Sequence, residues 1–448
     1  MRRILVANRG EIAVRVIRTC QRLGIRTVLA AAEPDLDSAA ARLADQTVPV
    51  GPARPEFSYL DTGRILRAAQ IAGADAIHPG YGFLAENPEL ARGCEAAGIV
   101  YIGPTGEQLA AVGDKLNARE LAVRAGLPVA PGGYLRTPAE APELAARIGY
   151  PVLVKAAGGG GGRGMQLVRE PAELTAAVDR GMAEARAAFA DQRVYLESYV
   201  ERGRHVEVQL LGDGQGGVLH LGDRDCSVQR RYQKLIEEAC APGLDADLRA
   251  AIRTAAVAFG ARLGYRGAGT VEFLVDTAAG AAYFLEMNAR IQVEHPVTEE
   301  VYRVDLVAEQ IAIAEGRPLR PELARLVPDG HAIECRINAE DPARDFQPSP
   351  GTVEAAWFPA GDGIRVDTHL QPGAAVPPFY DSLLAKVIAH GRDREQALDR
   401  LAAALRRCEI RGVSTNLPLL ARLVDDPEFR AGGVPTTWLA TRGALAHD

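Results

Sequence analysis

Apolar residues in the first quarter of the chain follow two periods, one typical of strands and the other of helices. A stripe formed by Ile12, Val16, Cys20 and Leu23 predicts a helix that Gly24 ends. Short apolar runs predict buried strands at residues 4–7, 27–31, 74–77 and 99–102. Strands that alternate with helices in this way predict a mainly parallel sheet.

From residue 113 onward the pattern changes to hairpins mixed with helices. An alanine-rich helix among strand-like runs at 151–155, 165–168 and 193–197 predicts a small α+β unit. A third region begins with a strand at 331–338 and includes a helix near 394–408. The predicted fold class is therefore α/β and α+β, with domains at residues 1–112, 113–330 and 331–448.

A hairpin in the second region brings two acidic residues together. A turn within residues 277–280, centred near residue 279, puts Glu272 opposite Glu286, and Asn288 falls on the same face two residues further along. Like charges ~5 Å apart across a sheet destabilise it. A hard divalent cation reverses that effect, because carboxylate oxygens are the ligands that Mg²⁺ binds. The pattern predicts a metal–nucleotide site, and a solvated hairpin face is the alternative.

Lysine is rare in this chain, and its few positions are informative. Of 51 basic residues only four are lysine, namely Lys115, Lys155, Lys234 and Lys386. Lysine offers a compact ammonium that arginine cannot replace, so lysines that persist in an arginine-rich chain predict sites that require one. Chance combined with codon bias is the alternative.

Lys155 is followed by a glycine-rich run at residues 158–164. Glycines let successive N–H groups converge on an anion, and a loop with few side chains suits a lid over a nucleotide. The run lacks the GK[ST] ending of a P-loop and leads into a strand. A disordered hairpin tip is the alternative. With no nucleophile elbow in the sequence, phosphoryl transfer is the predicted chemistry.

Composition excludes several classes of protein. A net charge of −7 argues against a nucleic-acid-binding protein. No apolar run approaches the ~20 residues that span a bilayer, and the N-terminal run, which stops at Ala7, is too short for a signal peptide. We therefore expect a cytoplasmic protein. The six cysteines form no CxxC pair and the eight histidines show no metal spacing. For Cys226 packing is the expected role, and the spacing of His205 favours a solvent-facing side chain.

Taken together, nine short segments resemble the biotin carboxylase family, the ATP-grasp component of biotin-dependent carboxylases such as acetyl-CoA carboxylase. The resemblance covers nearly the whole chain, in segments at residues 7–13, 78–84, 113–115, 155–165, 224–227, 229–234, 264–270, 286–298 and 334–341. It implies an N-terminal βαβ domain that precedes the ATP-grasp domain, a mobile lid at about residues 127–200, and a C-terminal mixed α/β domain.

The resemblance also implies roles for particular residues. ATP would be bound by Lys115, Lys155, Gly161, Gly162, Glu197, His205, Gln229 and Tyr232. Tyr232 stands where many bacterial members carry a histidine close to the nucleotide, which puts one contact in doubt. Mg²⁺ or Mn²⁺ would be held by Glu272 and Glu286 with Asn288 nearby.

Bicarbonate and biotin would occupy the other end of the site. The resemblance implies that Lys234, Arg290, Gln292 and Val293 hold bicarbonate and that Glu294 deprotonates it to form carboxyphosphate. Arg336 would stabilise the biotin enolate, and Tyr81 would lie near the biotin ring. Implied partners are a biotin carboxyl carrier protein and carboxyltransferase subunits, with the chain itself a homodimer that binds neither nucleic acid nor membrane.

No lysine adjoins a methionine, and Lys386 lies in a strand-like run, so we expect no biotin on this chain itself. The carboxyltransferase, not this chain, would choose among acyl-CoA, pyruvate or urea as final acceptor. Two alternatives remain: another ATP-grasp ligase, such as a carbamoyl-phosphate-synthetase-like half, and a nucleotide-binding regulator without turnover. Bicarbonate-dependent ATPase activity stimulated by free biotin separates the three.

Overall fold

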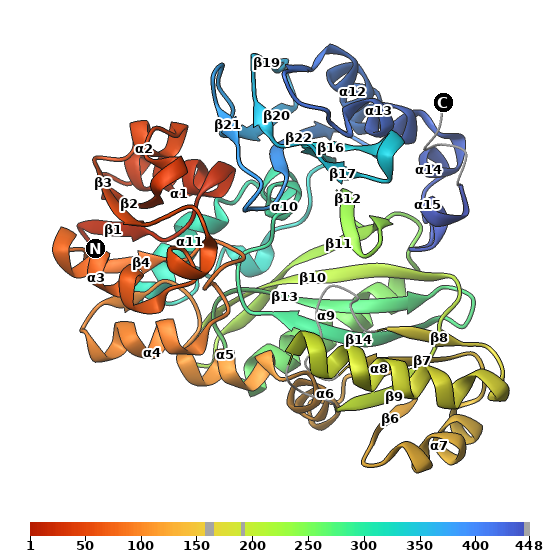
Figure 1. Ribbon diagram of the computed structural model, residues 1–448. Coiled ribbons are helices and arrows are strands. Elements are labelled where there is room, and N and C mark those ends of the chain that lie inside the picture. The colour runs from red at the N-terminus through yellow and green to blue at the C-terminus, as the bar shows by residue number, and fades with distance from the viewer. Residues whose placement is uncertain (157–164, 190–192, 443–448) are drawn as a thin grey trace.

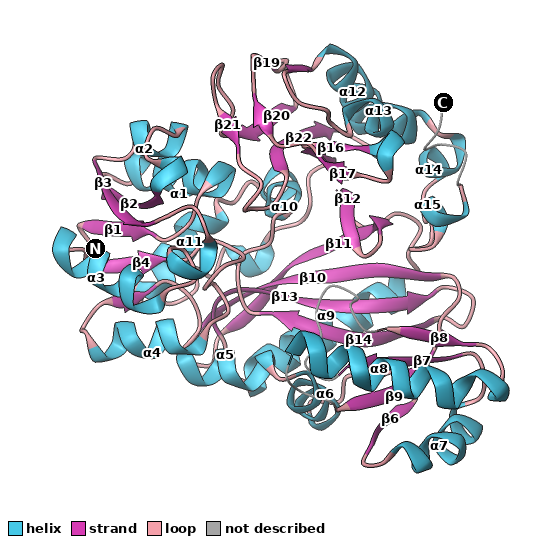
Figure 2. Ribbon diagram, viewed as in Figure 1, coloured by secondary structure: helices cyan, strands magenta, loops and turns pink. Residues whose placement is uncertain are grey.

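The computed structural model describes residues 1–156, 165–189 and 193–442. Figure 1 shows three regions, with the first quarter of the chain on one side and the last quarter above a broad central sheet. Figure 2 shows that helices and strands are mixed in all three, which confirms the predicted combination of α/β and α+β architecture. Among the described residues, no helix is both long and apolar enough to cross a membrane.

The first region is built on a parallel sheet. Its strands are β1 (Arg3–Val6), β2 (Arg26–Ala32), β3 (Gln46–Gly51), β4 (Ala76–His78) and β5 (Val100–Tyr101), in the order β3-β2-β1-β4-β5. Its helices are α1 (Gly10–Arg22), α2 (Ala39–Leu43), α3 (Thr62–Ala72) and α4 (Pro88–Ala96). The sequence pattern identified four of these strands. It missed β3, whose side chains alternate between exposed and buried.

The first helix differs from its prediction at one end. Ile12, Val16 and Cys20 are buried as expected, but Leu23 is 46% exposed and lies after the last helical residue. Gly24 follows with φ +70°, a conformation that glycine adopts without strain and that ends the helix there. The apolar stripe therefore stops one turn earlier than the sequence pattern predicted.

A small antiparallel sheet forms the outer part of the second region. Two helices, α5 (Gly106–Gly113) and α6 (Lys115–Arg124), lead to strands β6 (Gly132–Leu135), β7 (Val152–Ala156), β8 (Gln166–Val168) and β9 (Val194–Ser198), in the order β6-β9-β7-β8. The helices α7 (Ala141–Ile148) and α8 (Leu174–Phe189) pack against it. This matches the predicted α+β unit, and the predicted glycine loop lies outside the described residues.

One antiparallel sheet of eight strands runs through the rest of the molecule. The strands are β10 (Gly203–Asp213), β11 (Val218–Arg230), β12 (Gln233–Ala239), β13 (Arg266–Asp276), β14 (Ala281–Asn288), β15 (His331–Asn338), β20 (Ile364–Thr368) and β22 (Leu383–Gly391). Their order is β14-β13-β10-β11-β12-β15-β22-β20. Since β12 pairs with β15, the sheet continues from the second predicted region into the third.

Helices and short strands complete the two later regions. The helices are α9 (Ala246–Arg262), α10 (His295–Tyr302), α11 (Leu306–Ala314), α12 (Arg394–Arg407), α13 (Leu417–Asp425), α14 (Pro427–Ala431) and α15 (Trp438–Thr441). The short strands are β16 (Glu340–Asp341), β17 (Gln347–Pro348), β18 (Gly351–Thr352), β19 (Ala355–Trp357), β21 (Ala375–Val376) and β23 (Glu409–Arg411). Of these, α12 packs on β22 and β15 and covers the apolar face of the third region.

The acidic hairpin has the predicted pairing for an unexpected reason. Glu272 on β13 is paired with Glu286 on β14, as the sequence predicted. Asp276 pairs with Ala281, so the turn is centred between residues 278 and 279 rather than at residue 279. A regular ladder from this turn would place Glu272 opposite Leu285 instead of Glu286. A one-residue register shift next to Glu272 leaves Leu285 as an extra residue and restores the pairing of the two glutamates.

Candidate active site

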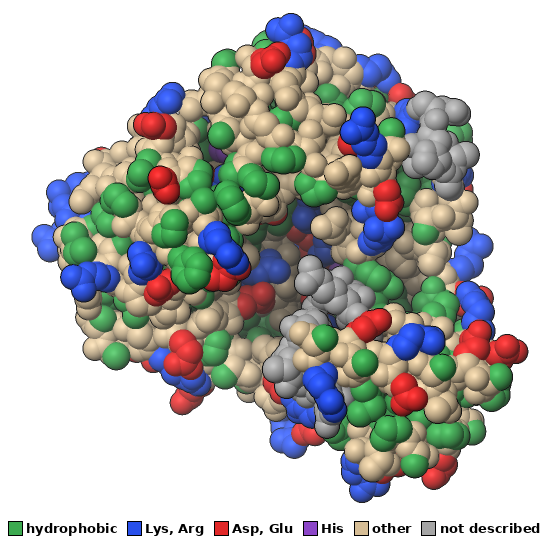
Figure 3. All heavy atoms as spheres, in the orientation of Figure 1, with side chains coloured by type: hydrophobic (Ala, Val, Ile, Leu, Met, Phe, Trp, Pro, Cys, Tyr) green, Lys and Arg blue, Asp and Glu red, His purple; other side chains and the backbone are tan. Residues whose placement is uncertain are grey.

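A row of charged side chains crosses four adjacent strands of the large sheet. The register pairs Glu286 with Glu272, Glu272 with Glu207, and Glu207 with Arg224. Directly paired residues share one face of a sheet, so three carboxylates and one guanidinium lie side by side. Arg224 is fully buried and its Nε donates a 2.6 Å hydrogen bond to Glu207. The other two carboxylates need cations from elsewhere, and Figure 3 shows acidic and basic side chains deep in a central hollow.

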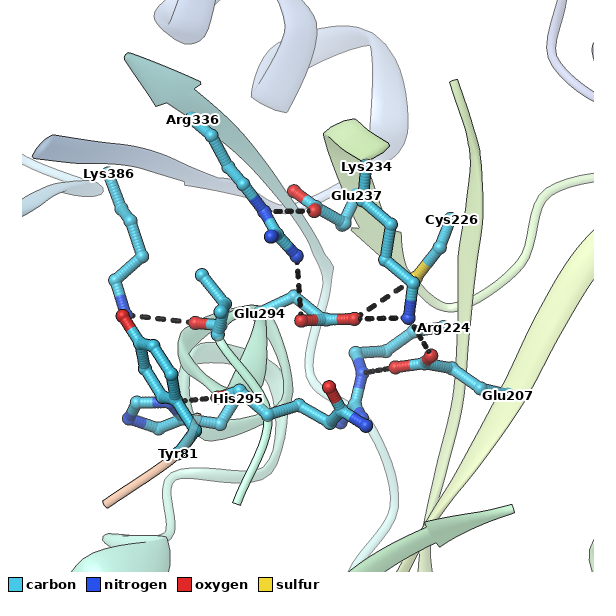
Figure 4. A network of polar contacts seen from close by, with 12 residues as sticks. Tyr81, Glu207, Arg224, Cys226, Lys234, Glu237, Glu294, His295, Arg336 and Lys386 are labelled. Atoms are coloured by element: carbon cyan, nitrogen blue, oxygen red, sulfur yellow. Dashed lines mark hydrogen bonds and ion pairs between the residues drawn. The ribbon is translucent and has the colours of Figure 1, made fainter. Parts of the chain in front are cut away.

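Lys234, at the start of β12, supplies one of these cations. Its Nζ donates to Glu207 at 2.7 Å, to Glu272 at 2.9 Å and to Glu294 at 2.8 Å. Burial by itself lowers the pKa of Lys234, but the three carboxylates outweigh it and raise the pKa well above its ordinary value. The ammonium is therefore fixed in its charged form at the centre of three acids, of which Figure 4 shows Glu207 and Glu294.

Glu294 lies just before α10, with its carboxylate between two cations. One oxygen accepts from Lys234, and the other accepts from Arg336 Nη2 at 2.9 Å. The thiol of Cys226 lies 3.7 Å from the first oxygen, so Cys226 forms part of the site wall as well as of the packing. Burial alone would raise the pKa of Glu294, but Lys234 and Arg336 hold it well below its ordinary value.

Two further buried carboxylates surround Arg336 on β15. Its Nε lies 2.5 Å from Glu237, and Glu237 on β12 is paired across the sheet with Glu334. Burial raises the pKa of Glu237 to about 7 against the opposing effect of Arg336, and it raises the pKa of Glu334 well above its ordinary value. The guanidinium thus faces acids on two sides, with Glu294 toward the centre of the site (Figure 4).

Arg290 connects the hairpin with the loop that precedes Glu294. Its Nη2 donates to Asn288 at 2.7 Å, its Nη1 to Gln292 at 3.1 Å, and its Nε to Glu86 at 3.1 Å. Burial alone lowers the pKa of Arg290, but Glu86 outweighs it and the pKa is raised. The predicted bicarbonate residues Arg290 and Gln292 are therefore in contact with each other.

The residues predicted to bind nucleotide lie along the hairpin and on the small sheet. Lys115 begins α6, and its Nζ is 3.3 Å from Glu286. Lys155 on β7 forms an ion pair with Glu197 on β9. Tyr232 is 56% exposed in the turn between β11 and β12, with φ +68°. Gly161 and Gly162 lie outside the described residues.

His205 differs from its sequence-based expectation. The alternating pattern favoured a solvent-facing side chain, but His205 is buried, because β10 lies in the interior of the large sheet. Its Nε2 lies 3.1 Å from Glu272 and its Nδ1 is 2.8 Å from Gln229 Nε2. Burial lowers the pKa of His205, but Glu272 outweighs it and the pKa is raised. His205 and Gln229, both predicted nucleotide ligands, are thus in contact.

The residues predicted to hold a metal fit a hard divalent cation. Asn288 Nδ2 donates to Glu272 at 3.0 Å, and Glu286 faces Glu272 across the hairpin. Burial alone raises the pKa of Glu272, but Lys234 and His205 lower it, which keeps the carboxylate ionised at neutral pH. Ionised carboxylates and an amide oxygen are suitable ligands for Mg²⁺ or Mn²⁺.

Sequence reasoning missed several charged residues of the site. Glu207, Glu237, Glu334, Glu11 and Lys386 were given no role, yet all five are buried. A period-two pattern links His205 with Glu207, which could have indicated a shared face. The pairing of Glu237 with Glu334 joins positions nearly one hundred residues apart, and no local pattern reveals it.

Three family models match successive parts of the chain. They are the N-terminal domain of biotin carboxylase at residues 1–109, the ATP-binding domain of the carbamoyl-phosphate synthase L chain at 114–322, and the C-terminal domain of biotin carboxylase at 334–441. A sheet that presents carboxylates and lysines beside a smaller antiparallel sheet, with this ATP-binding match, defines an ATP-grasp enzyme, an ATP-dependent ligase.

Curated relatives match over almost the full length. A biotin carboxylase of Pseudomonas aeruginosa is 49% identical over 442 residues, covering 98% of both chains. One from Nostoc is 48% identical over 439 residues with the same coverage. A biotin carboxylase of Haemophilus influenzae is 47% identical over 442 residues, again covering 98% of both chains. This chain belongs to the biotin carboxylase family.

Solved structures agree. The biotin carboxylase domain dimer of Hydrogenobacter thermophilus 2-oxoglutarate carboxylase, in complex with MgADP, ADP and bicarbonate, has a TM-score of 0.95 at 45% identity over 100% of this chain and 99% of its own. A nucleotide complex of Campylobacter jejuni biotin carboxylase has a TM-score of 0.95 at 42% identity over 98% of this chain and 99% of its own.

Proposed function

We propose that this chain carboxylates biotin carried on a separate biotin carboxyl carrier protein, with ATP and bicarbonate as co-substrates and carboxyphosphate as intermediate. The observation that carries the proposal is the position of Glu294, an ionised and fully buried carboxylate between Lys234 and Arg336. We assign Lys234 to bicarbonate on one side of this carboxylate and Arg336 to biotin on the other. The full-length similarity to biotin carboxylases supports the same assignment.

The nucleotide is bound between the two sheets. Lys115, Lys155 and His205 offer positive charge to its phosphates, and Gln229 orients His205 through their mutual contact. Glu272, Glu286 and Asn288 hold Mg²⁺ or Mn²⁺, which when bound neutralises phosphate charge. Glu197, Tyr232, Gly161 and Gly162 are the remaining proposed nucleotide contacts.

Bicarbonate is held by Lys234, Arg290, Gln292 and the backbone of Val293, beside the base Glu294. A base held well below its ordinary pKa accepts a proton poorly. Bicarbonate is an anion that shares Lys234 with Glu294, so its binding weakens the Lys234–Glu294 contact and raises the pKa of the base. The same substrate that needs a base therefore activates it.

The reaction then proceeds by phosphoryl transfer. An oxygen of deprotonated bicarbonate attacks the γ-phosphorus and ADP leaves, which gives carboxyphosphate. Its C–O bond breaks to release CO₂ and phosphate, and the phosphate takes the N1′ proton of biotin. Arg336 stabilises the enolate oxygen that forms, as fixed charge does where negative charge develops. N1′ attacks CO₂ to complete the transfer, beside Tyr81.

The test measures ATP hydrolysis by the purified chain with and without bicarbonate and free biotin, together with labelled bicarbonate in carboxybiotin. We expect a bicarbonate requirement, stimulation by biotin, and label in biotin. Bicarbonate-dependent turnover that ignores biotin would instead favour another ATP-grasp ligase, consistent with the shared carbamoyl-phosphate synthase model. Nucleotide binding without turnover would favour a regulator.

We further propose the domain limits 1–112, 113–330 and 331–448, with residues near 127–200 as a lid. The proposed partners are a carrier protein and a carboxyltransferase that selects the final acceptor, with this chain as a cytoplasmic homodimer. Dimeric organisation is supported by the Hydrogenobacter domain, which is described as a dimer. Capture of a carboxyltransferase on the purified chain, followed by assays with acyl-CoA and pyruvate, tests the partner and its acceptor.

A further inference from the structure

Lys386 is the one lysine of the chain that the proposed reaction does not use. It lies on β22 in the third region, and its side chain is completely buried. The other three lysines contact the carboxylates of the nucleotide and bicarbonate sites. An ammonium is expensive to bury, so its position calls for a physical reason.

The ammonium of Lys386 joins all three regions of the molecule. Its Nζ lies 3.1 Å from Glu11 on α1 and 3.9 Å from Asp367 on β20. It also donates a 2.9 Å hydrogen bond to the backbone carbonyl of Val293, in the loop that precedes Glu294. Figure 4 shows Lys386 approaching this loop from the side opposite Lys234.

A second contact extends from Lys386 to the other side of the proposed biotin site. The carboxylate of Glu11 that faces Lys386 also accepts a hydrogen bond from the hydroxyl of Tyr81. Tyr81 follows β4 in the first region, whereas Val293 belongs to the second. Both residues are proposed neighbours of bicarbonate or biotin, and the two contacts converge on one ammonium.

Simple charge balance does not account for this arrangement. Glu11, Glu334 and Asp367 all act on Lys386 electrostatically, but Arg365 pairs with Asp367 at 2.8 Å and already balances one of these acids. Any buried cation would serve that purpose, and arginine is far more common in this chain. The ammonium of Lys386 reaches a carboxylate and a backbone carbonyl from a completely buried position, where the larger planar guanidinium of arginine would need more space.

We propose that Lys386 is a positioning residue for the carboxyl-transfer step, fixing the carbonyl of Val293 directly and the hydroxyl of Tyr81 through Glu11. The inference rests on the proposed function, since it assigns the two positioned groups to the bicarbonate and biotin sites. Lys386 itself touches no substrate. It holds the loop of Val293 and the loop of Tyr81 at a constant separation, so that biotin meets bicarbonate-derived CO₂ in one geometry.

Two variants test the two contacts separately. Glu11→Gln keeps the shape of the side chain and the bond from Lys386 to Val293, and it changes the acceptor of Tyr81. Lys386→Met combined with Glu11→Gln removes the ammonium without leaving Glu11 as an unpaired buried charge. The matched control is Arg253→Met, which removes one of the two arginine partners of the buried Asp223 on β11, leaves Arg249 at 3.5 Å, and lies in none of the proposed substrate sites.

The assay is steady-state biotin-dependent ATP hydrolysis, with KM measured separately for biotin, bicarbonate and ATP. Glu11→Gln should lower kcat/KM for biotin roughly tenfold, with KM for bicarbonate and ATP within twofold of wild type. The double variant should also raise KM for bicarbonate roughly tenfold or more, with KM for ATP unchanged. Arg253→Met should lose thermal stability while its three KM values stay unchanged.

A purely structural role gives a different pattern. It would lower kcat in proportion to the folded fraction and leave every KM unchanged, and that result overturns the inference. Glu11→Gln alone decides the matter if the double variant does not fold, because an unchanged biotin kcat/KM refutes the link to Tyr81. Wild-type protein without biotin-stimulated turnover would refute the proposed function instead, so the two failures are distinguishable.

Discussion

Replacement of Lys234 by methionine gives the sharpest test of the charge arrangement. Methionine has a similar length and no charge, so Glu207, Glu272 and Glu294 would lose a shared donor at 2.7 to 2.9 Å. Removing one partner of a buried ion pair costs about 3–5 kcal/mol. Unfolding entropy of ~2.1 cal/mol/K per residue amounts to roughly 0.9 kcal/mol/K over 448 residues, so Tm should fall by roughly 3–5 °C at pH 8.

The loss of stability in the Lys234→Met variant should be smaller at low pH than at high pH. Burial is the largest effect on the pKa of Glu294 and raises it, and in the variant only the guanidinium groups of Arg336 and Arg224 still oppose burial, so the folded pKa should rise. A carboxylate whose folded pKa is raised contributes stability that is present below its unfolded pKa of ~4.3 and lost as pH rises through the folded value. The variant should therefore lie closer to wild type at pH 5 than at pH 8, and its bicarbonate-dependent ATPase should be lost at both.

Thermal unfolding followed by circular dichroism at pH 5 and pH 8 measures the Tm of Lys234→Met relative to wild type, with Lys115→Met as control. The Lys115 and Glu286 side chains are 32% and 40% exposed, so their pair contributes less than ~1 kcal/mol and Tm should change by at most about 1 °C. Equal Tm losses in the two variants, or a Lys234→Met deficit that does not change between pH 5 and pH 8, would refute the reasoning.

Three other predictions concern the chemistry. Glu286→Gln should abolish ATP turnover with the fold intact, whereas the control Asp276→Asn, at the far end of the same hairpin, should keep ATP turnover. Near-normal activity of Glu286→Gln at ordinary Mg²⁺ concentrations would contradict the metal assignment. Glu294→Gln should lower turnover by ~10² or more, and a collapse of nucleotide affinity measured by calorimetry would make it a binding residue instead. The purified chain from a biotin-replete host should give no streptavidin signal, because its lysines lie in ion pairs and none adjoins a methionine; a biotinylated band at 47.7 kDa would overturn this.

Local patterns predicted the elements of this fold better than its long-range pairings. The hairpin with Glu272 and Glu286 was predictable because both strands and their turn are adjacent in sequence. The pairing of β12 with β15 joins segments separated by α9, the acidic hairpin and two further helices, so no periodicity could reveal it. The one-residue shift at Leu285 was also invisible, since a turn length alone does not report a bulge.

In the candidate site, too, residues signalled by a local sequence feature were predicted, and features that depend on tertiary packing were not. Glu294 and Arg290 were identified through resemblance in one short segment, and Lys234 through the rarity of lysine. The burial of His205 was not predicted, because an alternating pattern does not tell which face of an interior strand is covered. Lys386 had the same signal of rarity as Lys234. Its strand-like surroundings concealed that β22 runs beside the loop of Val293.

The continuous eight-stranded sheet has a mechanical consequence. Four residue pairs join β12 of the second region to β15 of the third, so the two regions share one hydrogen-bonded sheet. A hydrogen-bonded ladder resists stretching along its strands and shearing between them. Arg336 on β15 and the carboxylates on β10 and β13 are therefore held in one rigid sheet. We expect movements that admit a nucleotide to leave this continuous sheet intact and to occur beside it, at the smaller sheet. A break made at residue 330 would expose the edge of β12 to strand pairing with other molecules, so the two regions should resist expression as separate pieces.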